Sequence, residues 1–104
     1  MFDTLKKIFS SSGNSPLKEL IADAFLVDVR TKEEFNEGSV KGAVNIPLDR
    51  IQQNIATFKN KKNIVVFCRS GMRSSQAKSI LERMGFDNVT NGGTWHNVQN
   101  QLSN

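Results

Sequence analysis

Residues 64–74 read IVVFCRSGMRS, and this stretch decides the fold class of the chain. Its first four residues are apolar and mostly β-branched, which is typical of a strand covered on both faces in a parallel sheet. The residues after the loop predict a helix that ends at Gly85. Its apolar face is formed by Ala77, Ile80, Leu81 and Met84. A buried strand followed by a short glycine-containing loop and a helix indicates an α/β protein.

Further strand signals are spread along the chain. Residues 24–29 (AFLVDV) predict a second buried strand, and residues 43–46 and 88–90 are candidate short strands. Helical signals lie between them. Thr31 followed by Glu34 predicts a capping box, and Asp49 followed by Gln52 predicts a similar start for a helix with an apolar face. That face would consist of Ile51, Ile55 and Phe58.

Two more helices are expected near the ends of the chain. Pro16 opens a short one, and Trp95, Val98 and Leu102 indicate another after a glycine pair. Strands that alternate with helices predict a small, doubly wound, mostly parallel sheet flanked by helices.

The length of 104 residues favours one domain, which we assign to residues 15–104. Residues 1–14 are interpreted as an N-terminal appendage and linker, because a short apolar helical pattern leads into a Ser/Gly/Asn stretch. The sequence contains no apolar run long enough to span a membrane. We therefore expect a cytoplasmic protein without stable membrane insertion, and a monomer.

Cys68 is the only cysteine and His96 the only histidine, so neither an internal disulfide nor a Cys/His metal site is expected. The net charge is +4, and residues 59–83, which contain Cys68, carry seven basic residues and one acidic residue. The whole basic excess is therefore expected to surround Cys68, which favours a small anionic ligand or an acidic partner. Nucleic acid is not expected as a partner, because the segment lacks interleaved aromatic residues.

Cys68 stands where ligands bind in parallel sheets, at the carboxyl end of a strand before a helix. Gly71 allows a tight loop whose backbone N–H groups turn inward, and the helix dipole points its positive end at the same place. Arg69 and Arg73 add positive charge. We therefore predict a reactive thiolate, with the pKa of Cys68 below that of a free cysteine.

These residues resemble a known family. The segment CRSGMRS (68–74) is similar to the active-site loop of single-domain rhodaneses, which carry sulfur as a cysteine persulfide. Three further segments fit the resemblance: LVDVR followed by EEF (26–35), GSVKGAVNIP (38–47) and NGGTW (91–95). Ser39 departs from the family pattern, which usually has histidine there.

The resemblance implies a sulfurtransferase of the thiosulfate type that needs no metal or organic cofactor. Cys68 would be the nucleophile, a small anion such as thiosulfate the donor, and a thiol, cyanide or protein the acceptor. The backbone of the loop, which consists of Arg69, Ser70, Gly71, Met72, Arg73 and Ser74, would hold the persulfide. Either Arg69 or Arg73 would bind the sulfonate end of the donor.

Three supporting residues are expected beside this loop. Asp28 and Arg30 form a mainly structural ion pair, and Trp95 forms a pocket wall or core plug. His96 is interpreted as a surface or capping residue rather than a general base.

Two other functions stay open. A cysteine-dependent phosphatase or arsenate reductase also uses a strand, a cysteine, an anion loop and a helix. Those phosphatases place five residues between nucleophile and arginine, whereas four separate Cys68 from Arg73. A reductase commonly needs a second thiol, which this chain lacks. The other alternative is a persulfide carrier or binding module that works only with protein partners.

Overall fold

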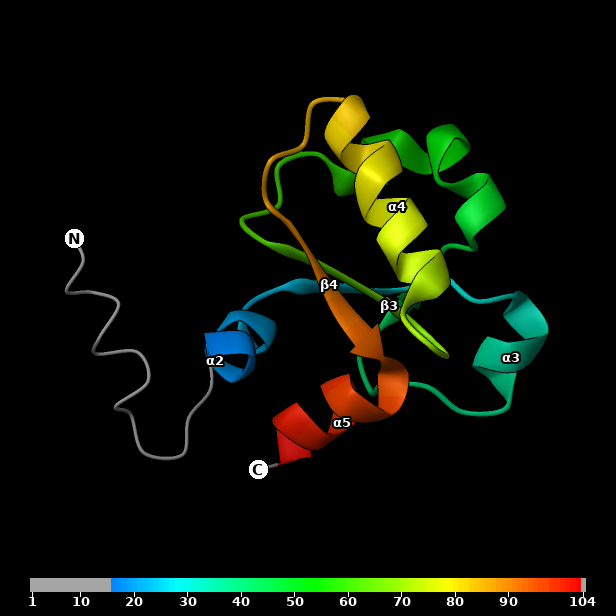
Figure 1. The fold of residues 1–104 in the computed structure, drawn as a ribbon, viewed down its shortest axis with the longest axis vertical. Coiled ribbons are helices and arrows are strands. Elements are labelled where there is room, and N and C mark those ends of the chain that lie inside the picture. The colour runs from blue at the N-terminus through cyan, green and yellow to red at the C-terminus, as the bar shows by residue number, and fades with distance from the viewer. Residues whose placement is uncertain (1–15, 104) are drawn as a thin grey trace, which may run out of the picture.

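The computed structural model describes residues 16–103, and within them four short strands form one parallel sheet (Figure 1). The strands are β1 (Phe25–Asp28), β2 (Val44–Asn45), β3 (Ile64–Cys68) and β4 (Val89–Thr94), in the spatial order β2-β1-β3-β4. The predicted doubly wound, parallel α/β fold is therefore confirmed. The appendage predicted at residues 1–14 lies outside the described residues.

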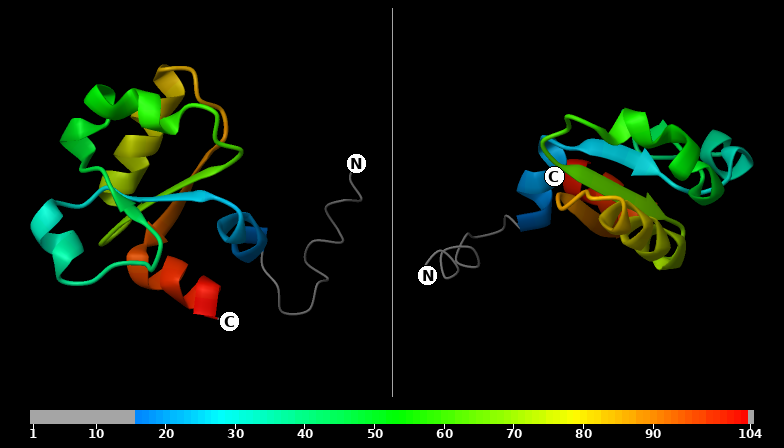
Figure 2. Two further views of the ribbon diagram at one scale, coloured as in Figure 1. Left: turned by 180° about the vertical axis from the view of Figure 1, so that it is seen from behind. Right: turned by 90° about the horizontal axis from the view of Figure 1, so that it is seen from above.

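Helices cover both faces of the sheet. The helices of the described residues are α2 (Pro16–Ala22), α3 (Lys32–Asn36), α4 (Met72–Arg83) and α5 (Trp95–Ser103), with the 3₁₀ segments η1 (Leu48–Arg50) and η2 (Gln52–Phe58). All of them except α3 contribute residues to the core on one face of the sheet or the other. In Figure 1, α4 and the 3₁₀ segments lie above the sheet, and α2 and α5 lie below it. The view from behind in Figure 2 shows α2 and α5 next to each other. None of the helices between residues 16 and 103 has the length and apolar character that crossing a membrane requires.

Strand β3 is the centre of the core, because all five of its side chains are buried. Successive side chains of a strand point to opposite faces. Ile64, Val66 and Cys68 accordingly pack toward α4 and η2, while Val65 and Phe67 pack toward α2 and α5. The continuous apolar run in the sequence thus corresponds to a strand that is covered on both sides. Cys68 is part of the α4 side of the core.

The segment after β2 differs from the predicted helix. Asp49 and Gln52 do not form a capping box, and the chain instead forms two 3₁₀ segments without side-chain caps. Asn54 interrupts the second segment with a non-helical φ of −113° and donates a hydrogen bond to the carbonyl of Arg50. The apolar spacing is still used, since Ile51 and Phe58 are fully buried against the sheet. A 3₁₀ helix, which is more tightly wound than an α-helix, can make the same apolar contacts. The spacing of apolar residues therefore did not distinguish the two.

Helix α4 begins at Met72, inside the segment 69–74 that the sequence assigns to the loop. Gly71, the residue before it, has a left-handed φ of +95°. This conformation lets the chain reverse direction directly after β3 and enter the helix sooner. The active-site loop that the sequence predicts is therefore shorter, and its last residues belong to the first turn of α4.

A bulge in β4 brings the sheet close to α5. Asn91 pairs with Val66 and Gly93 pairs with Phe67, so Gly92 is the extra residue between them. Gly92 is buried, and a Cβ atom there would lie 2.8 Å from Val98 Cγ2 and 2.9 Å from Val65 Cγ1. The bulge therefore depends on the absence of a side chain at position 92.

We predict that Gly92→Ala lowers the free energy of unfolding by about 1 to 3 kcal/mol, because the added methyl group overpacks the core. Chemical denaturation measures this effect. Val98→Ala should partly relieve it, so the cost of the double substitution should be smaller than the sum of the single costs. Additive costs would contradict the steric explanation.

Candidate active site

The predicted site lies where the carboxyl ends of β1 and β3 meet. Asp28, the last residue of β1, pairs with Phe67, the neighbour of Cys68. From β1 the chain connects to β2 on one side and later returns to β3 on the other side. Such a change of direction opens the crevice in which parallel α/β sheets bind ligands. The fold thus places Cys68 at the expected position for a ligand site.

Two backbone N–H donors and one hydroxyl group surround the sulfur of Cys68. The Gly71 N–H donates to Sγ at 3.0 Å and the Ser74 N–H at 3.4 Å, while Ser74 Oγ lies 3.4 Å from Sγ. The thiol itself is fully buried. The first residues of α4 and the left-handed turn at Gly71 therefore direct polar hydrogens at one buried sulfur atom.

The pKa of the Cys68 thiol lies below its ordinary value, as the sequence predicts. Burial acts in the opposite direction and raises this pKa, because it disfavours the charged form. Hydrogen bonds from the Ser74 side chain and from the backbone of Ser74, Gly71 and Ser70 outweigh burial. The pKa of Cys68 is thus lowered mainly by hydrogen bonds, whereas the sequence-based prediction also relied on the charges of two arginines.

Arg73 is held by an acidic residue of α3. Its guanidinium donates to Glu34 Oε1 at 2.7 Å and to Oε2 at 3.1 Å. Glu34 also completes the predicted capping box with Thr31, whose N–H donates to Oε1 at 3.0 Å. Hydrogen bonds from Arg73 and then from Thr31 lower the pKa of Glu34 to about 2. One carboxylate thus joins the start of α3 to the start of α4.

Asp28 and Arg30 form the predicted ion pair, and both are buried. Asp28 accepts hydrogen bonds from the backbone and side chain of Arg30, and also one of 2.6 Å from Ser39 Oγ. Arg30 donates in addition to the carbonyl of Gly38 at 2.6 Å. Ser39, the position that departs from the family pattern, therefore supplies a hydrogen bond to the buried carboxylate.

A polar pocket of about 250 Å³ lies beside the loop. Arg69 lines it, together with Trp95 and His96. The Trp95 ring packs against the Arg30 guanidinium, which lies 5.2 Å from the ring centroid, and against the His96 ring, with 4.0 Å between the two ring centroids. Among residues 16–103, Arg69 has no carboxylate within ion-pair distance. Glu34 and Glu37 also line this pocket, but neither lies within ion-pair distance of Arg69.

The basic residues of segment 59–83 do not gather around Cys68 in space. Lys61 and Lys62 precede β3, at the strand end opposite Cys68, where Lys61 lies over the Phe25 ring and Lys62 pairs with Asp23. A five-residue strand separates the two ends by roughly 13 to 16 Å. The expectation that this whole charge excess surrounds the cysteine is therefore wrong. Of these basic residues, Arg69 lies in the loop and Arg73 lies in the first turn of α4.

Comparison with known proteins assigns the family. A model of the rhodanese-like domain matches residues 14–94. This chain belongs to the rhodanese-like domain family. Thiosulfate sulfurtransferase PspE of Escherichia coli is 44% identical over 69 residues, which cover 64% of this chain and 66% of PspE. A sulfurtransferase of Allochromatium vinosum is 35% identical over 69 residues, which cover 66% of this chain and 64% of the relative.

A solved structure agrees with this assignment. The structure described as rhodanese with anions from E. coli is 40% identical, with a TM-score of 0.64 over 70% of this chain and 88% of that one. The rhodanese-like chain spans about two thirds of the length of the two curated relatives.

Sequence reasoning misses the part that four residues play in building this rhodanese-like site: Glu34, Gly38, Asn91 and His96. The sequence indicates Glu34 only as a helix cap, and its bond to Arg73 crosses 39 positions of the chain. His96 is exposed, as predicted, but it also lines the pocket beside Arg69. Asn91 contacts Ser74 Oγ at 2.7 Å. Its place within the segment NGGTW is the only sequence signal for it.

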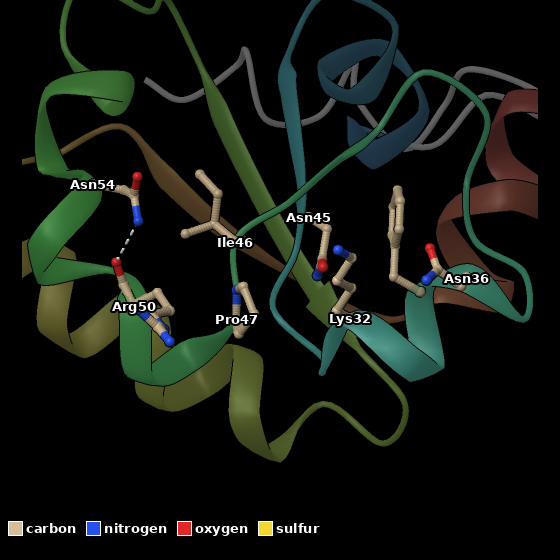
Figure 3. Close-up of a pocket in the computed structure, with 8 residues that line it drawn as sticks. Lys32, Asn36, Asn45, Ile46, Pro47, Arg50 and Asn54 are labelled. Carbon is tan, nitrogen blue, oxygen red and sulfur yellow. Dashed lines mark hydrogen bonds between the residues drawn. The ribbon is translucent and has the colours of Figure 1, made fainter.

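A larger pocket of about 520 Å³ lies elsewhere, between α3 and the 3₁₀ segments (Figure 3). Its lining includes Lys32, Arg50 and three asparagines around an apolar floor. Neither Cys68 nor any residue of the loop lines it. The smaller pocket contains one residue of the loop, Arg69, which follows Cys68 directly. It is therefore the candidate binding pocket.

We predict that Glu34→Gln lowers the free energy of unfolding by about 1 kcal/mol at pH 7, because the ion pair with Arg73 is partly buried. The folded-state pKa of Glu34 lies below its ordinary value of 4.5. Its contribution is therefore complete above about pH 4.5 and is lost as the pH falls toward about 2.

Urea unfolding at several pH values measures this effect. Glu33→Gln, one position away on an exposed part of α3, serves as the control and should change stability little. Equal stabilities of the two variants at pH 7 would contradict a stabilising role of the Glu34–Arg73 pair.

Proposed function

We propose that this protein is a sulfurtransferase that carries sulfane sulfur as a persulfide on Cys68. The observation that carries the proposal is the set of donors around Sγ, from Gly71 N–H at 3.0 Å and from Ser74. They stabilise negative charge on sulfur without a metal ion. The names of the sulfurtransferase relatives support the same reaction class. A reducing compartment such as the cytoplasm would keep the lone thiol available.

The proposed reaction has two steps. The Cys68 thiolate attacks the outer sulfur of thiosulfate, a bond forms between this sulfur and Sγ, and the S–S bond of the donor breaks. Sulfite leaves with the electron pair. An acceptor thiolate or cyanide then attacks the outer sulfur of the persulfide, and the electron pair of the broken S–S bond returns to Sγ. Each step exchanges one anion for another, so the same hydrogen-bond donors serve both.

We assign donor binding to Arg69 rather than Arg73. The Arg73 guanidinium already donates two hydrogen bonds to Glu34. Arg69 lines the pocket beside the loop and has no carboxylate partner among the described residues. Thiosulfate carries two negative charges and approaches an anionic sulfur, so it needs a positive charge that is not already neutralised. Arg69 meets this requirement.

The phosphatase alternative is weakened by the same contact. In that class an arginine of the loop holds the phosphate, and here the corresponding residue, Arg73, is paired with Glu34. The loop is also one residue shorter than in those phosphatases, with four residues between Cys68 and Arg73. A shorter loop suits one sulfur atom better than a tetrahedral phosphate group.

The carrier alternative has one observation in its favour. Met72, the first residue of α4, is 71% exposed and follows directly on the loop. An exposed apolar side chain next to a nucleophile is suited to contact with a protein partner. Loading of Cys68 by thiosulfate alone, followed by release to a small thiol, would favour the enzyme over the dedicated carrier.

The first test is intact-mass spectrometry after incubation with thiosulfate. We expect a gain of about 32 Da, the mass of one sulfur atom, that is removed by a reducing agent. Cys68→Ser should show no gain, because it removes the only thiol of the chain. Absence of the adduct with thiosulfate and with other sulfane donors would contradict the proposed function.

The second test concerns the sulfonate end of the donor. Arg69→Ala should raise KM for thiosulfate and lower kcat/KM about 10- to 150-fold, as expected for a lost hydrogen bond to a charged group. Transfer from an uncharged persulfide donor should be affected less. Arg83→Ala, near the far end of α4, removes the same charge away from the site and should leave both rates unchanged. Equal losses with both donors would assign Arg69 to another role.

A further inference from the structure

Asn91 of β4 contacts the two residues that donate hydrogen bonds to Cys68. Its Nδ2 donates to the carbonyl of Gly71 at 3.2 Å, and its Oδ1 accepts from the Gly93 N–H at 2.9 Å. Ser74 Oγ lies 2.7 Å from the same Oδ1. Gly71 and Ser74 are also the residues that donate hydrogen bonds to Sγ. One amide side chain is therefore linked to both donor residues of the nucleophile.

The orientation of this amide is fixed by the backbone. A carbonyl can only accept a hydrogen bond, so the group that faces Gly71 is the NH₂ of Asn91. An N–H can only donate, so the group that faces Gly93 is the oxygen. The short contact between Ser74 Oγ and Oδ1 therefore requires the hydroxyl of Ser74 to donate to Asn91.

The Ser74 hydroxyl has one proton but two neighbours that can accept it. When its proton points to Asn91, Ser74 can only accept a hydrogen bond from Cys68, and this arrangement requires a protonated thiol. When Cys68 is a thiolate, the hydroxyl stabilises Sγ by turning its proton toward the sulfur, 3.4 Å away. Ionisation of Cys68 thus breaks the hydrogen bond between Ser74 and Asn91.

We propose that Asn91 is a positioning residue that holds the hydroxyl proton of Ser74 while Cys68 is a thiol and releases it to Sγ when the thiol ionises. The proton of the thiol leaves to a base in the solvent, its electron pair stays on sulfur, and Asn91 neither gains nor loses a proton. The inference deepens the proposed function, on which it rests, because it identifies what adjusts the ionisation of the nucleophile.

Titratable groups of the neighbouring elements lie around the loop. They are Asp28 of β1, Arg30 directly after β1, Glu34 of α3, Glu37 after α3, Arg69 of the loop, Arg73 of α4 and His96 of α5. Strand β4 contributes no charged side chain. Replacing Asn91 with alanine leaves all of these charges in place, so a change in ionisation reports on the hydrogen-bond chain.

The test compares wild type, Asn91→Ala, Ser74→Ala and the double variant. The rate of alkylation by iodoacetamide, followed against pH, gives the pKa of Cys68 in each, since the chain has no other thiol. Asn91→Ala frees a hydroxyl for Sγ only where Ser74 is present. We therefore compare the change in the pKa of Cys68 that Asn91→Ala causes in the two backgrounds. This change should be more negative in wild type than in the Ser74→Ala background, by about 0.4 to 1 unit. The difference corresponds to one hydrogen bond. Equal shifts in both backgrounds would overturn the inference.

Asn91→Asp provides a second variant with the opposite expectation. A carboxylate holds the Ser74 proton more strongly, so the rise in the pKa of Cys68 should be larger in wild type than in the Ser74→Ala background. A loss of loop structure would not produce shifts of opposite sign, and equal rises in both backgrounds would contradict the inference. The comparison of Asn91→Asp in the two backgrounds remains informative if Asn91→Ala fails to fold.

Asn97→Ala is the matched control. Asn97 donates to the carbonyl of Gly92 at 3.0 Å, so it supports the same bulge. Its hydrogen bonds within residues 16–103 go to Gly92 and Thr94 rather than to Cys68 or Ser74. Its pKa profile should therefore match that of wild type.

The two proposals can fail separately, because alkylation does not require sulfur transfer. Coupling between Asn91 and Ser74 without a persulfide would contradict only the proposed function. A persulfide without coupling would contradict only the role of Asn91.

Discussion

The hydrogen bond from the Gly71 N–H to Cys68 Sγ is the interaction on which the site depends. It closes a turn of four residues between a strand buried on both faces and the first turn of α4. Gly71 has a φ of +95°, and a Cβ there would meet only an ordinary contact with Gly93 Cα at 3.6 Å. Backbone conformation, rather than lack of space, therefore requires glycine here. The turn directs the Ser74 N–H to the same sulfur.

Two ion pairs hold the surroundings of this turn, and they differ in what they contribute. Asp28 and Arg30 are buried, and Ser39 and Gly38 satisfy further hydrogen-bonding groups of the pair. Breaking such a pair leaves a buried charge, so it acts as a rigid frame. The pair of Glu34 with Arg73 is only partly buried, and its strength is modest. This pair matters mainly because it fixes the position of α3 relative to Arg73 in the first turn of α4.

Local patterns predicted most of the fold. Three features depend only on neighbours within a few residues: the apolar run before Cys68, the capping box at Thr31 and the glycine after α4. They could therefore be predicted from the sequence alone. Spacing could not distinguish a 3₁₀ segment from an α-helix after Pro47, because both bury Ile51 and Phe58. The position of Cys68 at the end of a strand and the lowered pKa of its thiol followed from the order of strand, loop and helix. The contacts of Glu34 and Asn91 did not, since they join positions far apart in sequence.

The basic residues near Cys68 show that the number of charges in a sequence segment does not predict the charge at the site. The segment around Cys68 has a large excess of positive charge, yet in space Arg73 is neutralised by Glu34, Arg30 by Asp28, and Lys62 pairs with Asp23 at the other end of β3. Of the two arginines closest to Cys68 in sequence, only Arg69 has no carboxylate partner among residues 16–103, and the N–H groups of Gly71 and Ser74 face the sulfur. This is sufficient for the proposed reaction, because the thiolate and the persulfide each carry one negative charge on sulfur. Hydrogen-bond donors can hold either state, and an additional positive charge is needed only while the doubly charged donor is bound.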